Sequence, residues 1–147
     1  MTTNHEHDAA GRMAIEVVSS ADFDQTVAAC RDALAEEGFG VLTEIDMAAT
    51  LTKKLGGEHE PYLILGACHP PSAQQLIGTY PALGVLLPCN VIVSRENDET
   101  IVRAMDPAAV VAAVLRSAPD AEMDDVVVIE TIADDIAGRL RSALARL

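Results

Sequence analysis

An uninterrupted apolar run, Tyr62–Cys68, constrains the fold of this chain more than any other stretch of its sequence. Such a run is typical of a strand that is covered on both faces or lies in the middle of a sheet. His69 and two prolines end it, and Pro71 suits the first turn of a helix because a missing amide hydrogen costs nothing there. The run therefore predicts an inner strand followed at once by a helix.

Other segments alternate between the patterns of strands and helices. The expected strands are residues 13–17, 39–46, 84–94 and 100–105, and the expected helices are residues 21–37, 71–80, 107–115 and 120–147. Residues 46–57 are expected to form a short helical or irregular crossover. The order β-α-β-β-α-β-β-α-α predicts an α+β fold, with an antiparallel-rich sheet of about five strands and helices on one face. Because proline cannot donate a ladder hydrogen bond, Pro88 predicts a sheet edge or a bulge beside Cys89.

The domain organisation follows from composition. Residues 1–11 are polar and aperiodic, so we expect a disordered N-terminal arm, followed by a single α+β domain over residues 12–117. Residues 118–147 predict an amphipathic helix that packs on the domain or on a partner chain. Its apolar stripe comprises Val126, Ile129, Ala133, Ile136, Leu140, Ala143 and Leu147.

The formal net charge of -13 excludes two classes of partner. A surface of that charge repels phosphate backbones and anionic lipid surfaces, so we expect neither nucleic-acid binding nor membrane binding. The N-terminus lacks the apolar core of a signal peptide, and no apolar run reaches the length of a membrane span. We therefore expect a cytoplasmic protein whose three cysteines are reduced.

Common catalytic and nucleotide-binding signatures are missing from the sequence: it has no glycine-rich phosphate loop, nucleophile elbow, zinc-protease motif or C-x-x-C. Two less ordinary blocks remain, residues 62–70 and 86–91. With them the chain resembles the domain-of-unknown-function 302 family. The matching residues are 44–46, Lys53 or Lys54, Gly56, Tyr62, 64–68, Pro70, Ala73, Gly84, 86–91 and 106–107.

The resemblance covers residues 13–115 and implies a TATA-binding-protein-like α+β fold, commonly assembled as a homodimer. It implies no established activity and no DNA binding. Two features depart from the family pattern. His69 stands where the family more often has asparagine, and the helix after Asp120 extends beyond the usual end of the domain.

Cys68 and Cys89 are the main candidates for chemistry, because each lies in one of the two unusual blocks. If they are neighbours in the sheet, they and His69 could bind Cu(I) or Zn(II). Alternatively they form a redox dithiol or carry sulfur, provided that one thiol has a lowered pKa. The competing interpretation is that both are small apolar residues packed in strands. Cys30 lies on an apolar helical stripe and is expected to belong to the core.

These observations lead to one preferred hypothesis and two alternatives. The preferred one is a homodimeric module that binds a small ligand through Cys68, Cys89, Asn90 and Tyr62, or a metal through Cys68, His69 and Cys89. The first alternative is a thiol-dependent redox or sulfur-carrier protein, and the second is a structural or assembly protein that works through its last helix. Of these hypotheses we favour those in which the protein is not an enzyme.

Overall fold

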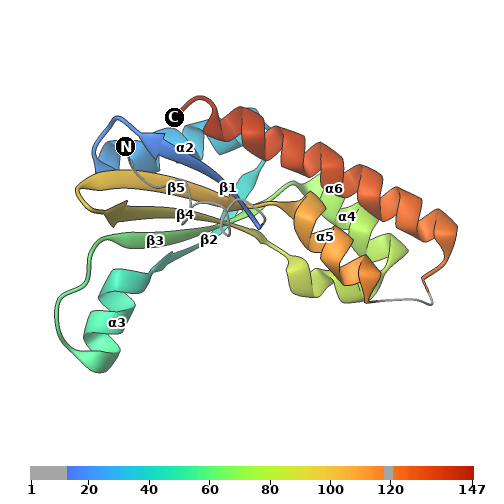
Figure 1. Ribbon diagram of the computed structural model, residues 1–147, viewed down its shortest axis with the longest axis horizontal. Coiled ribbons are helices and arrows are strands. Elements are labelled where there is room, and N and C mark those ends of the chain that lie inside the picture. Colours follow the sequence, from blue (N-terminus) through green and yellow to red (C-terminus); the bar gives the residue numbers. More distant parts are fainter. Residues whose placement is uncertain (1–12, 118–120) are drawn as a thin grey trace, which may run out of the picture.

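The computed structural model describes residues 13–117 and 121–147. Within these ranges the chain forms a five-stranded antiparallel sheet in the order β1-β5-β4-β3-β2 (Figure 1). The strands are β1 (Ala14–Ser19), β2 (Gly40–Asp46), β3 (Tyr62–Cys68), β4 (Cys89–Glu96) and β5 (Glu99–Met105). Strands β1 and β2 are therefore the two edges, and the predicted α+β class and element order are confirmed.

The helices cover one face of this sheet, apart from one that projects beyond it. Helices α2 (Phe23–Glu36) and α6 (Met123–Leu144) pack beside each other against the strands, with α4 (Pro70–Thr79), the 3-10 turn η1 (Pro81–Leu86) and α5 (Pro107–Arg116) at one end. Helix α3 (Met47–Leu55) extends away from the sheet between β2 and β3. None of the helices in the described ranges is long and apolar enough to cross a membrane.

Local sequence signals explain where the elements begin and end. Asp22, Asp46 and Asp106 each accept a hydrogen bond from a backbone N–H in the first turn of the helix that follows, which satisfies donors that the helix leaves unpaired. Gly38 lies just after the end of α2 and has a φ of 85°, a conformation that favours glycine. The β4–β5 hairpin turns at Asn97 and Asp98, which both adopt positive φ.

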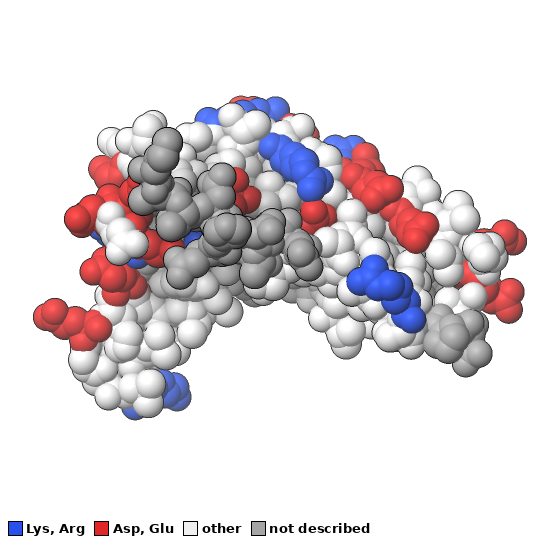
Figure 2. Space-filling view, viewed as in Figure 1, with Lys and Arg blue, Asp and Glu red and all other residues white. Residues whose placement is uncertain are grey.

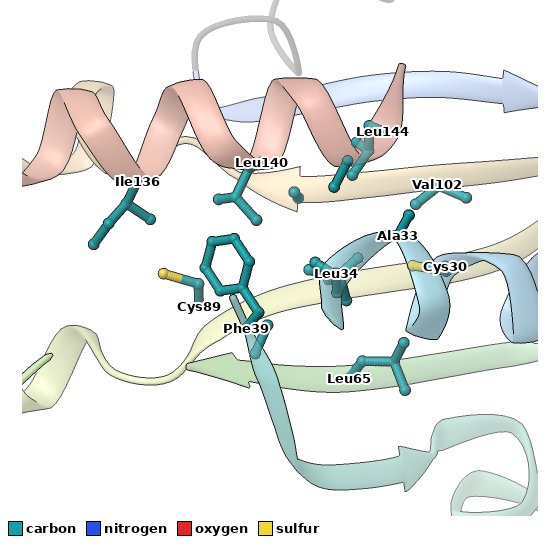
Figure 3. Close-up of a cluster of buried hydrophobic side chains, with 14 of the residues drawn as sticks. Cys30, Ala33, Leu34, Phe39, Leu65, Cys89, Val102, Ile136, Leu140 and Leu144 are labelled. Carbon is teal, nitrogen blue, oxygen red and sulfur yellow. The ribbon is translucent and has the colours of Figure 1, made fainter. Parts of the chain in front are cut away.

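The core lies between the sheet and helices α2 and α6. Leu65, Val91 and Val102 on three neighbouring strands are fully buried, as is Leu34 of α2 (Figure 3). On α6 the stripe that the sequence predicted faces this core: Ile129, Ala133, Ile136, Leu140 and Ala143 are buried, whereas Val126 and Leu147 are half-buried. The last helix therefore packs on its own chain.

The segment around Pro88 was predicted wrongly. Residues 84–87 are not part of a strand, because the chain first makes the η1 turn and β4 begins only at Cys89. Strand β4 lies in the interior of the sheet between β5 and β3, and Pro88 precedes its first residue, where no ladder hydrogen bond is needed from the proline. The irregularity lies instead in edge strand β2, between Val41 and Thr43. The arm predicted for residues 1–11 falls outside the described residues.

Candidate functional site

The strand register separates the two thiols that the sequence analysis grouped. Cys89 pairs directly with Ala67 of β3, and directly paired residues of neighbouring strands point to the same face of a sheet. Cys68 is the next residue along β3 and points to the opposite face, because side chains alternate along a strand. Cys89 therefore faces the helices, while Cys68 faces away from them, and the thiols do not share a pocket.

Cys89 belongs to the hydrophobic core. Its side chain lies near Phe39 and Ile136 in the close-up view, and the residue is only 4% exposed (Figure 3). The adjacent cavity, lined by Leu76, Leu83 and other apolar residues, has a volume of about 20 Å³, far below that of a small-molecule site. Burial, with a smaller contribution from Cys68, raises the pKa of the Cys89 thiol to about 11. At neutral pH this thiol keeps its proton, so it is a poor nucleophile.

The contacts of His69 are those of a structural residue rather than of a metal ligand. It occupies the position before α4, its Nδ1 lies 2.7 Å from the Ser72 hydroxyl, and its ring meets the edge of Phe39. Burial, helped by Arg139 and opposed by Asp135, lowers the pKa of the imidazole. Over residues 13–117 and 121–147 no three histidine, cysteine, aspartate or glutamate side chains are grouped so that they could hold a metal ion. The proposed set of Cys68, His69 and Cys89 is accordingly not assembled.

Three of the four predicted ligand-binding residues do share a surface. We define the open face as the side of the sheet opposite α2 and α6. By register it includes Tyr62, Ile64 and Cys68 of β3, Asn90 and Ile92 of β4, and Ile45 of β2. Asn90 is exposed there. At Gly66 the surface is closed by Thr43 and Pro88, whose atoms occupy the space that a side chain would need.

A charged network also lies on the open face. Arg103 of β5 donates to Glu16 of β1 and to Glu96 of β4, with Nε 2.6 Å from the Glu16 carboxylate. Hydrogen bonding to Glu96, reinforced by Glu16 and partly opposed by burial, raises the pKa of the guanidinium above its ordinary value. These three side chains tie an edge strand to the two central strands next to it. Because it links strands to one another, we assign it a structural role.

Glu44 and Asp46, the two carboxylates at the end of β2, are both engaged in structural contacts. Glu44 forms an ion pair with Arg31 of α2 at 2.6 Å, and Asp46 caps α3 through a hydrogen bond from the Ala49 N–H. Each carboxylate therefore stabilises the position of a helix.

A cleft beside α3, which we call the α3 cleft, is not among the sites expected from the sequence. Its volume is about 500 Å³, and it is lined by Phe23, Asp46, Ala48, Ala49, Thr52, Lys53, His59, Pro61, Tyr62 and Leu63. The lining comes from the first turn of α2, the end of β2, helix α3, the loop after it and the start of β3, and it combines apolar side chains with an ammonium, an imidazole and a carboxylate. Thr52 and His59 contact each other across 3.0 Å. The one sequence signal was the adjacent pair Lys53 and Lys54.

Helix α3 is packed more loosely than the other helices. None of its nine residues is buried, although Met47, Ala48 and Leu51 are half-buried on the side that faces the sheet. Figure 2 shows basic side chains at the far end of this lobe, whereas acidic side chains gather at the β4–β5 end of the sheet and along α6. The cleft thus lies beside the only two lysines of the chain, with the carboxylates of Asp46, Glu58 and Glu60 also nearby.

Comparisons with known proteins agree on one family. Residues 15–147 match the model of a family described as domain of unknown function DUF302. The crystal structure of an uncharacterized conserved DUF302 protein from Bacillus stearothermophilus is 28% identical, with 91% of this chain and 97% of that chain covered and a TM-score of 0.78. No curated protein matches the chain. The family match reaches the last residue, so the C-terminal helix lies within the matched region rather than beyond it.

Proposed function

The chain belongs to the DUF302 family of unknown function, and on that premise we propose that it is a small-ligand-binding module whose binding site is the α3 cleft. One observation carries the proposal. The cleft combines a volume of about 500 Å³, within the usual range of ligand pockets, with an apolar floor and a few converging polar groups. The cavity next to Cys89 has neither the volume nor the polar groups for this role.

The thiol alternative has less support. A redox dithiol or a sulfur carrier needs one reactive thiolate with a second thiol or an acceptor within reach. Burial raises the pKa of Cys89 to about 11, and the same cause raises that of Cys30 to about 11. Cys68 points to the other face of the sheet from Cys89. The geometry favours binding over thiol chemistry.

The open face supports the second part of the proposal, that the module works as a homodimer. On this face Ile45 of edge strand β2 is 44% exposed, and Ile64 and Ile92, its neighbours in register, are half-buried. Apolar side chains on an uncovered sheet face favour association. Within the same face Arg103 pairs with the carboxylates of Glu16 and Glu96, so the guanidinium offsets part of the negative charge there.

Sedimentation analysis of matched variants tests the dimer. Ile45→Glu places a charge on the open face at a residue too exposed to affect folding strongly, and we expect it to shift the protein to monomer. Ile77→Glu is the control, since Ile77 of α4 is also 44% exposed but lies on another surface. A wild-type protein that is monomeric at high concentration, or two variants that behave alike, would contradict association through this face.

Ligand binding is tested by an amide NMR screen with a small-molecule library of mixed charge. We expect the responding amides to cluster in α3 and in residues 56–61. Ala49→Trp should block the response, because Ala49 is an exposed residue that lines the cleft. Thr50→Trp, on the same helix but outside the lining, is the control. Ligands that bind the folded protein while leaving these amides unchanged would refute this location.

A further inference from the structure

We infer that the α3 cleft takes a small monocarboxylate with an apolar body, an inference that rests on the proposed function and adds the class of ligand. The starting point is the placement of the lysines. The chain contains only two, Lys53 and Lys54, and both lie in the last turn of α3. Lys53 lines the cleft, whereas Lys54 does not. The ammonium of Lys53 is therefore the positive charge that a ligand in this cleft would meet.

His59 supplies a second group for an anionic oxygen. Its Nδ1 lies 3.0 Å from the hydroxyl of Thr52, which holds the ring against α3. When that hydroxyl donates to Nδ1, the ring proton resides on Nε2, and the Nε2–H is a donor for a carboxylate oxygen. An ammonium and an imidazole N–H on one cleft are suited to the two oxygens of a single carboxylate.

The rest of the cleft is apolar. Phe23 comes from the first turn of α2, Pro61 and Leu63 come from the entry to β3, and Ala48 and Ala49 form the α3 side. These side chains expose carbon surface that a hydrocarbon or aromatic ring would remove from water. A ligand that is polar throughout would not bury this apolar surface.

The surrounding charges restrict the ligand to one negative charge. Asp46 lines the same cleft, and Glu58 and Glu60 flank His59 along an adjoining hollow of about 590 Å³. The partial negative charge at the C-terminal end of α3 adds to them. A phosphate ester or a dicarboxylate would bring a second charge into this field and be repelled. One carboxylate is what Lys53 and His59 can compensate.

The test is an amide NMR titration of the full chain with 3-phenylpropionate, its neutral amide and phenyl phosphate. We expect the carboxylate to shift the amides of α3 and to bind more tightly than either of the other two. Lys53→Gln should weaken carboxylate binding by up to about fivefold, the upper range for a solvent-exposed charged contact. Lys54→Gln should leave it unchanged, since both variants remove the same charge and only one lines the cleft.

The outcomes separate this inference from the proposed function. Equal binding of the amide, tighter binding of phenyl phosphate or equal effects of the two lysine variants would overturn the ligand class while leaving the cleft as a binding site. The same holds if the mixed library yields ligands for the cleft but 3-phenylpropionate does not bind. If neither the library nor the carboxylate perturbs α3, the inference and the proposed function both fail.

Discussion

Replacing Gly66 with alanine tests the closest approach on the open face. Gly66 lies within β3, paired with Asn90 on one side and with Thr43 on the other. A Cβ at this position would lie 2.2 Å from the Thr43 hydroxyl oxygen and 2.9 Å from Cγ of Pro88. Ordinary contact begins at 3.4 Å, so the Thr43 oxygen would have to move by about 1.2 Å, the difference between 3.4 Å and 2.2 Å. The Thr43 side chain can rotate, but the proline ring is stiff.

The expected cost combines two opposing effects. Overpacking of this kind destabilises by about 1–3 kcal/mol, whereas the lower entropy of the unfolded chain after a glycine-to-alanine change returns about 0.4–1 kcal/mol. The net loss is about 1–2 kcal/mol, which for a chain of this size corresponds to a fall in Tm of about 2–8 °C. Urea unfolding followed by circular dichroism measures the free energy directly.

Two further variants decide whether the reasoning is right. Thr43→Ala removes the nearer of the two atoms, so Gly66→Ala should cost less in that background, and a double-mutant cycle gives the coupling. Gly138→Ala is the control, because nothing lies within 4 Å of its Cβ position in the exposed middle of α6, and it should stabilise the protein by up to about 1 kcal/mol. A Gly66→Ala protein as stable as the wild type would refute the close approach.

Four other predictions follow from the core and the charge. Burial raises the pKa of Cys30 and Cys89 from 9.0 to about 11, so their thiols ionise at lower pH in the unfolded chain than in the folded one. The free energy of unfolding should therefore fall as the pH rises from about 9 to about 11. In the double variant Cys30→Ala with Cys89→Ala, the urea midpoint should fall less over this pH range. At neutral pH the two thiols should resist a disulfide reagent until the chain is unfolded, and rapid modification of native Cys89 would contradict its burial. Ile136→Asp puts an unpaired charge at a residue that is 4% exposed, so we expect a loss of several kcal/mol; an unchanged melting temperature would contradict the packing of α6. With a net charge of -13 we expect no binding to a random DNA duplex at physiological salt, and submicromolar, salt-sensitive binding by fluorescence anisotropy would disprove this.

The site was harder to predict than the elements that carry it. The sequence placed both Cys68 and Cys89 in strands, which the structure bears out, yet whether two thiols on adjacent strands meet depends on a single residue of register. The pairing of Cys89 with Ala67 instead of Cys68 puts the sulfurs on opposite faces. That pairing is chosen by the packing of whole strands and not by the residues next to each cysteine.

The α3 cleft illustrates the same limit. Lys53 and Lys54 are conspicuous in the sequence as the only lysines, but nothing local says which of them borders a cleft. Phe23 and Lys53 line the same cleft although 30 positions separate them, because the fold brings the first turn of α2 and helix α3 to its border. No short-range pattern contains that information.

The sequence by itself determined the features that depend on residues within a few positions of one another. The order of strands and helices and the apolar stripe of α6 belong to this class, because strand alternation and helical periodicity act over a few residues. The tertiary structure alone decided that β4 is an inner strand, that Cys89 faces the core and that α3 borders a cleft. These depend on which distant segments pair, and that choice is made by the burial of the whole core rather than by any one segment.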